Sequence, residues 1–391
     1  MKNLPESTNY ISKILILICL VSACTQKKKS DTLNQERIRT TQISNEAKKV
    51  RNYVMKNAVI AHRGSTYWTP EETEAAYRWA RNVGADYLEI DVQLTKDKVL
   101  VAFHDNKLGR TTNVSELFPD RVESEISDFT LRELRSLDIG SWFNTAFPSR
   151  ARPAYEDLKI MTLKDVVMIA EGNQIMKKNG TPVEEIIDGN WTGNYLYEAD
   201  PNDNGNRPGI YVETKRPTSN VEIILAKEIL EYGWNVNSDP KAIFTQEGKV
   251  SVANSNARLI LQSFSFESIQ QLEKTLPNIP KCLLLDKANM KDDLEENYKK
   301  AIHFGIENNV HIIGPSIVDT SNNSKELTAM TTLIHDAGML INPYTFDTNE
   351  QLNEYKDRVE GVFTNRADLA LAFYGRGSTA SSEEILKNLG Y

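Results

Sequence analysis

Residues 58–94, AVIAHRGSTYWTPEETEAAYRWARNVGADYLEIDVQL, decide the fold. A short apolar run at residues 59–61 predicts a strand. The segment after it carries apolar residues at helical spacing up to Gly84, a residue typical of helix C-termini. A second strand is expected at residues 87–94, where apolar and polar residues alternate. Strand, helix and strand in this order form one unit of an alternating β/α fold.

The same alternation recurs over most of the chain and predicts eight strands, nearly all followed by a helix. The other six strands are expected at residues 209–215, 259–263, 282–285, 310–313, 339–342 and 361–364. Further helices are expected at about 162–171, 221–232, 266–275, 292–304, 324–336, 349–357 and 366–374. Eight βα units predict a TIM (β/α)8 barrel rather than an open sheet.

The alternation breaks between the second and third barrel strands. Residues 99–103 are predicted to pair with the second strand as a hairpin partner. Residues from about 106 to 155 show only short helical pieces, so we expect an insertion after the second strand. A loop rich in Gly, Asn and Asp is expected at residues 189–208.

The N-terminus is predicted to be a secretory signal. Residues 14–21 form an apolar run far shorter than the roughly 20 residues needed to span a bilayer, and small residues follow it. The sequence Val21-Ser22-Ala23-Cys24 resembles the lipobox of bacterial lipoproteins, which implies cleavage before Cys24 and lipidation of its thiol. The alternative is a plain signal peptide that is cut nearby.

These features divide the chain into four regions. We expect a signal peptide at residues 1–23, a polar tether at 24–56, the barrel at 57–376 and a peripheral C-terminal tail at 377–391. The expected location is the bacterial cell envelope, with the protein held to a membrane by a lipid on Cys24, either in the periplasm or on the surface. Cys282 is then the one cysteine beyond the anchor, which excludes an intrachain disulfide.

The composition is that of a globular protein with a negative net charge. Of the 391 residues, 40% are hydrophobic and 26% are charged, and the formal net charge is −8 at pH 7. General nucleic-acid binding needs a basic face, so the sequence is a poor candidate for that class of function.

Two predicted barrel strands carry carboxylates on one face. Glu89 and Asp91 alternate with apolar residues that suit the outer helices, so we expect the carboxylates to point into the barrel. Glu213 and Lys215 share a face in the third strand. Three carboxylates form an all-oxygen ligand set, which suits Ca²⁺ or Mg²⁺ better than Zn²⁺. The alternative is an ion-pair network of these carboxylates with Arg63 and Lys215.

Two histidines are expected near the same mouth of the barrel. His62 ends the first strand and His104 ends the hairpin strand. A lone histidine at a strand end is usually structural, but a pair can serve as general base and general acid across a bond that is cleaved. The guanidinium of Arg63 matches phosphate, and Lys215 adds a second positive charge. These groups together favour cleavage of a phosphodiester.

The sequence resembles the glycerophosphodiester phosphodiesterase family over roughly residues 58 to 370. The motifs that carry the resemblance are His62-Arg63-Gly64, Pro70-Glu71-Glu72-Thr73, Glu89-Ile90-Asp91, Phe103-His104-Asp105, Val212-Glu213-Thr214-Lys215, Leu261-Gln262-Ser263-Phe264, Gly314-Pro315, Pro343-Tyr344-Thr345 and Gly361-Val362-Phe363-Thr364-Asn365.

The resemblance implies a TIM barrel with an insertion after the second strand. It implies catalytic roles for His62 and His104, and metal binding by three carboxylates: Glu89, Asp91 and Glu213. It further implies phosphate contacts by Arg63 and Lys215. One departure is Glu72, which stands where the family commonly has asparagine. This residue either alters hydrogen bonding near the site or begins a helix, where a carboxylate is favourable.

Three functions remain open at this point. The first is metal-dependent hydrolysis of glycerophosphodiesters to sn-glycerol 3-phosphate and an alcohol, with water or the 2-hydroxyl of the substrate as first nucleophile. The second is a lysophospholipase D or phospholipase C-like activity on membrane lipids. The third is a lipoprotein that binds phospholipid headgroups without turnover. Aromatic residues of the insertion, Trp142, Phe143 and Phe147, either shape a lid or alcohol pocket or pack against the barrel.

Overall fold

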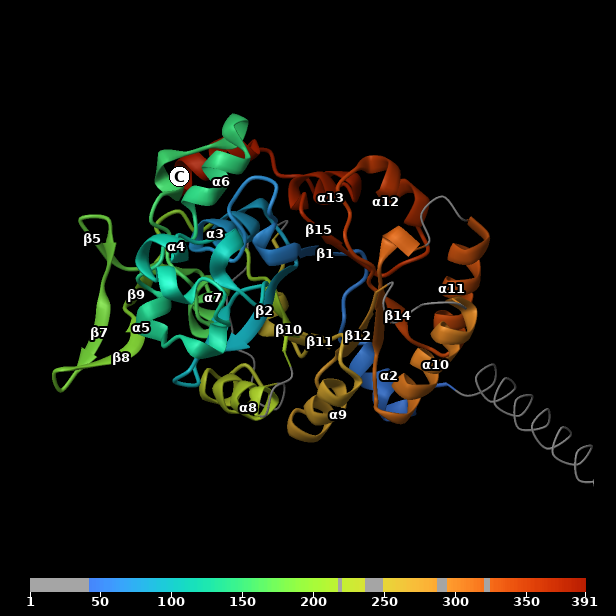
Figure 1. The fold of residues 1–391 in the computed structure, drawn as a ribbon. Helices are drawn as coiled ribbons and strands as arrows, with labels where there is room; N and C mark the ends of the chain where they lie inside the picture. Colours follow the sequence, from blue (N-terminus) through green and yellow to red (C-terminus); the bar gives the residue numbers. More distant parts are fainter. Residues whose placement is uncertain (1–41, 217–219, 236–248, 287–293, 320–323) are drawn as a thin grey trace, which may run out of the picture.

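The computed structural model describes residues 42–216, 220–235, 249–286, 294–319 and 324–391. Within them, eight parallel strands form a nearly closed barrel with helices around it (Figure 1). The predicted signal peptide, Cys24 and most of the predicted tether lie outside the described residues.

The barrel strands confirm the predicted order. They are β1 (Ala58–Ala61), β2 (Tyr87–Leu94), β10 (Gly209–Thr214), β11 (Leu259–Ser263), β12 (Lys281–Leu285), β13 (Ile312–Pro315), β14 (Leu340–Ile341) and β15 (Gly361–Thr364). Hydrogen-bonded neighbours follow sequence order from β10 to β14, and β15 returns to pair with β1. Backbone hydrogen bonds from Glu360 to Ile341 (3.0 Å) and from Phe346 to Phe363 (2.8 Å) close the gap between β14 and β15.

Alternation along β2 explains why this sequence makes a barrel. Leu88, Ile90 and Val92 are fully buried and join the core between the strands and the outer helices. Tyr87 points inward, where it packs edge-on against Tyr211 of β10 in a separate cluster inside the barrel. The barrel therefore has an outer apolar layer and a filled floor, and both follow from a side-chain period of two.

The predicted helices cover the outside of the barrel. They are α3 (Glu74–Val83), α7 (Leu163–Ala170), α8 (Val221–Glu231), α9 (Phe266–Thr275), α10 (Leu294–Glu307), α11 (Ser324–Asp336), α12 (Asn349–Tyr355) and α13 (Ala367–Phe373). α3 begins at the N-cap Thr73, whose hydroxyl accepts a hydrogen bond from the Ala76 amide, and it ends at Gly84, which has a φ of 107°.

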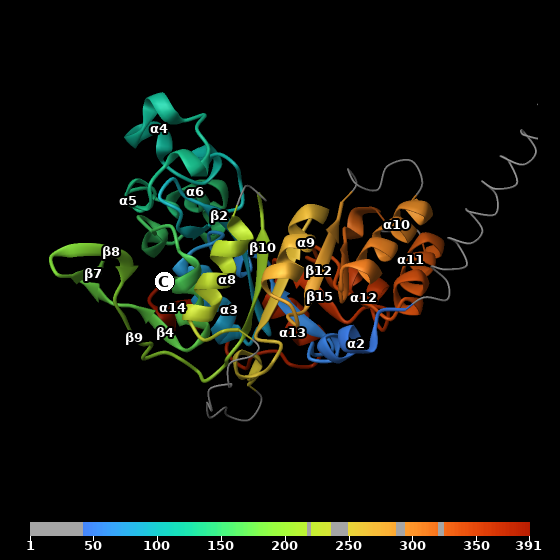
Figure 2. The same cartoon turned by 90° about the horizontal axis from the view of Figure 1, so that it is seen from below.

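The insertion lies where the sequence predicts it. It follows β3 (Leu100–Ala102), which pairs antiparallel with β2 as expected. Its short helices include α4 (Val114–Leu117), α5 (Leu131–Leu134) and α6 (Ser141–Ala146). They gather on the side of the barrel away from α10 and α11, at one end of the molecule (Figures 1 and 2).

The prediction of a loop at residues 189–208 is wrong for its first half. The chain between α7 and β10 forms short antiparallel pairs, with β4 (Asn173–Ile175) against β9 (Tyr197–Ala199) and β7 (Glu184–Ile187) against β8 (Asn190–Tyr195). β8 includes turn-type residues such as Asn190 and Gly193, so its composition does not signal a strand. The β7–β8 hairpin projects from the body of the protein (Figure 1).

The part of the predicted tether that the structure describes is not a solvated linker. Residues 45–51 form α2 (Asn45–Arg51), in which Ala47 and Val50 are buried. The Ile43 amide donates to the Ala337 carbonyl at 3.0 Å, just before β14 begins. α2 therefore packs where the strands start, at the end of the barrel opposite the insertion helices (Figure 2).

The predicted tail is also part of the fold rather than peripheral. Residues 382–389 form α14 (Ser382–Leu389), which packs against α3. Its apolar side chains Ile385, Leu386 and Leu389 are buried. Serine-rich composition before the helix hides this packing, because Ser381 serves as the N-cap of α14 rather than as part of a flexible tail.

We expect deletion of residues 379–391 to destabilise the protein clearly. Removing three buried apolar side chains, at roughly 1.5–3 kcal/mol each, costs several kcal/mol of unfolding free energy. Chemical denaturation of the truncated and full-length chains measures the difference, with the surface substitution Lys387→Gln as the control. A truncated chain with unchanged stability would contradict this packing role.

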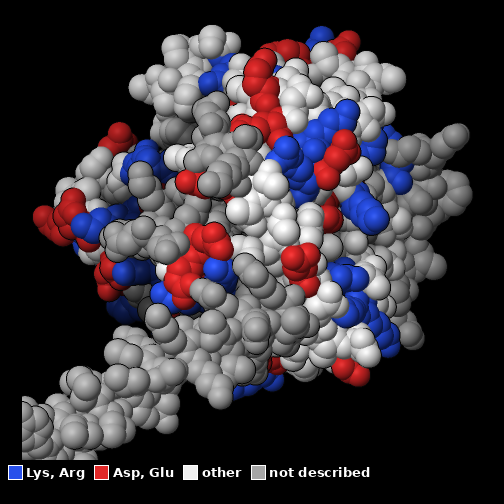
Figure 3. Space-filling model, turned by 90° about the vertical axis from the view of Figure 1, so that its right-hand side faces the viewer, with Lys and Arg blue, Asp and Glu red and all other residues white. Residues whose placement is uncertain are grey.

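The surface and the helices give two further observations. On the described part of the face in Figure 3, acidic and basic side chains are interspersed with uncharged ones, so that face has no field of a single sign. Among the described residues, no helix combines the length and apolar character needed to cross a membrane.

Candidate active site

The turn after β1 places two polar side chains at the mouth of the barrel. Arg63 adopts a left-handed backbone with a φ of 51°, and its amide donates to Glu89 Oε2 at 2.7 Å. Gly64 has a φ of 79°, and a Cβ there would lie 2.5 Å from the Cβ of Ala76 in α3. Glycine is therefore required at residue 64 so that the turn can press against α3 while His62 and Arg63 face the pocket.

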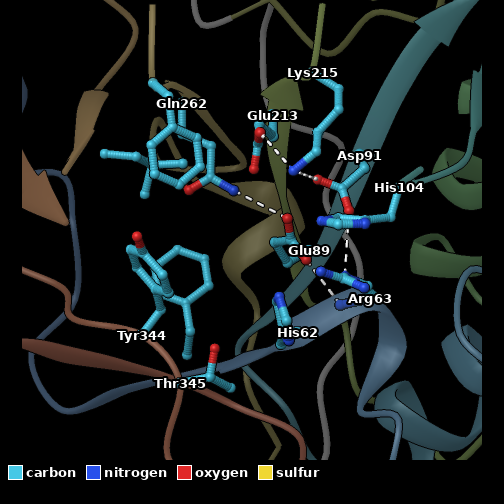
Figure 4. Close-up of a pocket in the computed structure, with 13 residues that line it drawn as sticks. His62, Arg63, Glu89, Asp91, His104, Glu213, Lys215, Gln262, Tyr344 and Thr345 are labelled. Carbon is cyan, nitrogen blue, oxygen red and sulfur yellow. Dashed lines mark hydrogen bonds and ion pairs between the residues drawn. The ribbon is translucent and has the colours of Figure 1, made fainter. Parts of the chain in front are cut away.

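Three carboxylates meet inside the barrel, as predicted from the strand period. Asp91 and Glu213 are paired in the register of β2 and β10, and Glu89 lies two residues before Asp91. Each offers an oxygen within 4.8 Å of the others, and all three side chains are buried. Figure 4 shows them converging from the two neighbouring strands.

Cationic and amide groups border this cluster. Lys215 Nζ lies 3.1 Å from Glu213 Oε1 and 3.8 Å from Asp91 Oδ1, while Arg63 Nε lies 3.4 Å from Asp91 Oδ2. The Gln262 amide donates to Glu89 Oε1 at 3.0 Å. The ion-pair network is thus present, but it leaves the Oδ2 atom of Asp91 buried without a hydrogen bond.

The pKa values of the three carboxylates shift in different directions. Burial and the negative charge of Asp91 raise the pKa of Glu213 to about 8. Burial and its two carboxylate neighbours also raise the pKa of Glu89. Burial alone would raise the pKa of Asp91, but Lys215 and Arg63 hold it well below its ordinary value. Two cations therefore do not neutralise the cluster.

The residues present fit a hard divalent cation. The set contains oxygen donors alone, one oxygen lacks a hydrogen bond, and two carboxylates are held against mutual repulsion. A bound cation relieves each of these penalties, and such a donor set suits Ca²⁺ or Mg²⁺. An ion-pair network alone does not account for these features.

We expect the metal-free protein to lose stability as pH rises from 5 to 8. The folded pKa of Glu213 is about 8 and its ordinary value is 4.5, so the folded state binds this proton more tightly. That contribution is complete below the ordinary value and is lost as pH rises through the folded value. Asp91 acts in the opposite sense, but only below its ordinary value of 3.8.

Thermal melts in excess chelator at pH 5, 6, 7 and 8 measure this dependence. The Glu213→Gln variant should lose part of the slope, because it removes the carboxyl that titrates in this range. An identical slope in the variant and the unmodified protein would contradict the assignment.

The two histidines have different partners. His62 Nδ1 lies 2.8 Å from Asn365 Oδ1, which also accepts a hydrogen bond from the Thr66 hydroxyl. Burial and the adjacent Arg63 charge lower the pKa of His62 to about 3. His62 is therefore neutral, and its Nδ1–H donates to Asn365, which leaves a lone pair on Nε2. His104 Nδ1 lies 2.6 Å from the carboxylate of Asp105.

The cavity between these groups is lined by charged residues and histidines on one side and mainly by apolar residues on the other. Its volume is about 190 Å³, below the roughly 300–1,000 Å³ of pockets for drug-sized ligands. Both histidines, the three carboxylates, Arg63 and Lys215 line it, which brings every predicted site residue together. The rest of the lining, which includes Phe264, Leu284, Tyr344 and Phe363, is largely apolar. The pocket therefore suits a small molecule with an anionic group and a short carbon skeleton (Figure 4).

Glu72 alters hydrogen bonding beneath the site, which is the first of its two predicted roles. It precedes α3 and its N-cap, with a φ of 59°. Its Oε1 accepts a hydrogen bond from the Asp91 amide at 3.1 Å, and the Tyr77 hydroxyl donates to its Oε2. Burial, Asp91 and Glu89 raise the pKa of Glu72 well above its ordinary value. The residue thus supports the backbone of the strand that carries Glu89 and Asp91.

Some residues of the site were given no role from sequence. Gln262 and Asn365 stand in quoted motifs, but only the folded structure shows that they hold Glu89 and His62. Conversely, the aromatic residues of the insertion do not line the cavity. Phe143 is fully buried against Tyr155 in the insertion's own core, and Trp142 and Phe147 pack on that core. These three residues therefore pack rather than form a pocket, but their ring contacts lie within the insertion and not against the barrel as predicted.

Comparison with known proteins gives a consistent result. The sequence matches the Glycerophosphoryl diester phosphodiesterase family over residues 62–223 and 244–369. It is 29% identical over 316 residues to a glycerophosphodiester phosphodiesterase of Bacillus subtilis (strain 168), a match that covers 79% of this chain and 84% of that protein. It is 42% identical over 118 residues to a glycerophosphodiester phosphodiesterase of Caldanaerobacter subterraneus subsp. tengcongensis, or 30% of this chain and 45% of that protein.

Solved structures show the same barrel. A phosphodiesterase of Oleispira antarctica in complex with the product sn-glycerol-3-phosphate superposes with a TM-score of 0.53 at 18% identity, covering 82% of this chain and 97% of that one. A glycerophosphodiester phosphodiesterase of Agrobacterium tumefaciens gives a TM-score of 0.51 at 21% identity, covering 81% and 99%. At these identities, the likeness concerns the fold.

Proposed function

Because the chain belongs to the glycerophosphoryl diester phosphodiesterase family, we propose that its pocket cleaves glycerophosphodiesters with two histidines and a bound divalent cation. The protein is a phosphodiesterase that hydrolyses glycerophosphodiesters to sn-glycerol 3-phosphate and an alcohol. The observation that carries the residue assignment is a single small cavity lined by two histidines, three carboxylates, an arginine and a lysine.

The metal site consists of Glu89, Asp91 and Glu213. When bound, a divalent cation neutralises negative charge on the phosphate oxygens. Ca²⁺ is the first candidate and Mg²⁺ the second, because both prefer carboxylate oxygens. The support is the buried all-oxygen cluster with one oxygen lacking a hydrogen bond.

Arg63 and Lys215 orient the phosphate beside this cluster. Burial alone would lower the pKa of Lys215, but Asp91 and Glu213 raise it, so the ammonium stays charged at the pocket wall. The Arg63 guanidinium lies between Asp91 and Glu71 and also lines the pocket. Two fixed cations stabilise the charge that builds on the phosphate during cleavage.

His62 and His104 move the protons. One histidine takes a proton from the attacking water or 2-hydroxyl, and the other gives a proton to the departing alcohol. The alcohol therefore need not leave as an alkoxide. A hydrogen bond at Nδ1 fixes the ring orientation in both residues, through Asn365 and Asp105. The Nε2 atoms remain for the substrate.

A panel of substrates assayed with each metal tests the function. Glycerophosphocholine, glycerophosphoethanolamine and glycerophosphoinositol should each release sn-glycerol 3-phosphate, whereas lysophosphatidylcholine should be a poor substrate because the cavity is small. A 2-deoxy analogue separates attack by water from attack by the substrate's 2-hydroxyl. Lack of product from every glycerophosphodiester, with each metal supplied, would overturn the proposed function.

We also propose that Cys24 carries a lipid that holds the protein in the bacterial cell envelope. The support is the sequence Val21-Ser22-Ala23-Cys24 after a short apolar run. Radiolabelled palmitate should be incorporated into the unmodified protein, and a Cys24→Ser variant should lose the label and leave the membrane fraction. Equal labelling of both proteins would contradict the anchor.

A further inference from the structure

A chain of hydrogen bonds and ion pairs joins two residues of the pocket. It starts at His104, whose Nδ1 lies 2.6 Å from Asp105 Oδ1. Arg110 Nε lies 2.5 Å from the other oxygen of Asp105. The fork of Arg110 then grips both oxygens of Glu71, at 3.1 and 2.5 Å. Glu71 Oε1 finally accepts a hydrogen bond from Arg63 Nη1 at 3.2 Å.

The middle of this chain belongs to the insertion. Arg110 lies in its first turn, residues 108–110, whereas Glu71 belongs to the loop before α3 and Asp105 follows β3. Arg110 therefore connects two segments that each carry a residue lining the pocket. A lysine could not replace it, because a single ammonium cannot make a bidentate contact with Glu71 and a separate contact with Asp105.

The chain is formed of charged groups at the rim of the site rather than in the core. The side chain of Arg110 is 44% exposed and that of Asp105 is 26% exposed, while Glu71 is 10% exposed. Exposed ion pairs contribute little to folding stability. Their contribution here is geometric, because each side chain is fixed at two points and the ends of the chain are His104 and Arg63.

Electrostatics keeps both carboxylates of the chain charged. Burial alone would raise the pKa of Asp105, but hydrogen bonds from His104 and Arg110 lower it. Burial alone would raise the pKa of Glu71, but Arg110 and Arg63 lower it. The negative charges that hold the two pocket residues are therefore retained at neutral pH.

We propose that Asp105, Arg110 and Glu71 are positioning residues that orient His104 and Arg63 for phosphodiester cleavage, so that the insertion takes part in catalysis through Arg110. This inference rests on the proposed function. Asp105 fixes the ring of His104 so that Nε2 faces the substrate, and Glu71 holds the Arg63 fork beside the phosphate. Arg110 keeps both carboxylates in place.

Three variants test the proposal against the unmodified enzyme with glycerophosphocholine. Asp105→Asn and Arg110→Lys should lower kcat about 10- to 100-fold, the loss typical when a group that orients a reacting residue is removed. Glu71→Gln should mainly raise KM, because it acts through the phosphate contact of Arg63. Arg121→Lys is the matched control, since Arg121 lies in the same insertion and pairs with Glu133 at 2.7 Å, away from this chain.

A double-mutant cycle distinguishes positioning from a general structural role. If Asp105 acts through His104, adding Asp105→Asn to His104→Ala should lower kcat by less than twofold further. A second readout does not depend on activity. The His104 Nδ1 proton should resonate far downfield in ¹⁵N-histidine spectra of the unmodified protein, and Asp105→Asn should shift it upfield.

The outcomes separate the two proposals. Turnover by the unmodified enzyme together with wild-type kcat in Asp105→Asn and Arg110→Lys would overturn the positioning role alone. Fully additive losses in the cycle would also overturn it, because they would show that Asp105 acts independently of His104. Absence of turnover in the unmodified enzyme would instead overturn the proposed function. Because Arg110 is exposed, its lysine variant provides the test even if Asp105→Asn folds poorly.

Discussion

Replacing His62 or His104 with alanine should lower kcat for glycerophosphodiester hydrolysis by about 10²- to 10⁴-fold, the contribution typical of one general acid or base. Both rings line the cavity and both are held at Nδ1, so each presents Nε2 for proton transfer and alanine removes that group. Release of sn-glycerol 3-phosphate, followed at saturating substrate and metal, measures the loss.

The matched control is His303→Ala, because His303 lies on α10 and interacts with Glu307 far from the pocket lining. It should retain wild-type turnover. His62→Gln provides a second variant that fills most of the buried space of the ring. Near-wild-type rates in a folded variant of either pocket histidine would overturn its assignment.

The same variants reveal which histidine is the acid. A p-nitrophenyl ester of glycerol phosphate has a leaving group that departs without protonation. The variant that lacks the general acid should therefore recover much of its rate on this ester, whereas the variant that lacks the base should not. Equal losses on both substrates in both variants would contradict a division of roles.

Chelation should abolish activity, and Ca²⁺ or Mg²⁺ should restore it, because the three buried carboxylates would repel the phosphate without a bound cation. Metal should also stabilise the folded state by mass action, so that melting temperature rises with metal concentration, most clearly near and above pH 8, where Glu213 loses its proton in the metal-free protein.

Glu213→Gln separates these effects. It should lower metal affinity and turnover together, yet raise the melting temperature of the metal-free protein at pH 8, since it removes a buried charge that the fold holds at a penalty. The control is Glu350→Gln, an exposed change on α12. Full activity of the unmodified enzyme in excess chelator would remove the cation from the mechanism.

Much of the barrel could be predicted because side-chain alternation within each strand is a local signal. Alternation along residues 87–94 separates Leu88, Ile90 and Val92 from Glu89 and Asp91, and a period of two needs no knowledge of the neighbours. Once that face is known to point inward, Glu213 joins by the same rule. The predicted site residues therefore meet in one cavity.

The elements and residues that the sequence analysis missed depend on contacts or on local signals that composition obscures. α2 is fixed largely by what it packs against. α14 and the β7–β8 hairpin do carry local signals, the capping box of Ser381 and Glu384 and the Asp188-Gly189 turn, but serine-rich and polar composition around them obscures these signals. The supporting residues Gln262 and Asn365 are of types that occur anywhere. Their roles depend on Glu89 and His62, which lie 173 and 303 residues away in sequence. No pattern within a single segment encodes such a pairing.

The position of α2 bears on how the enzyme meets its substrates. The described chain enters at the closed end of the barrel, where Ile43 bonds to Ala337, while the pocket opens beyond the other ends of the strands. A bilayer, resin or fusion partner attached just before residue 42 would therefore lie at the end of the barrel opposite the pocket. The pocket would then face the solvent. That orientation suits binding of dissolved glycerophosphodiesters rather than lipids of the supporting surface.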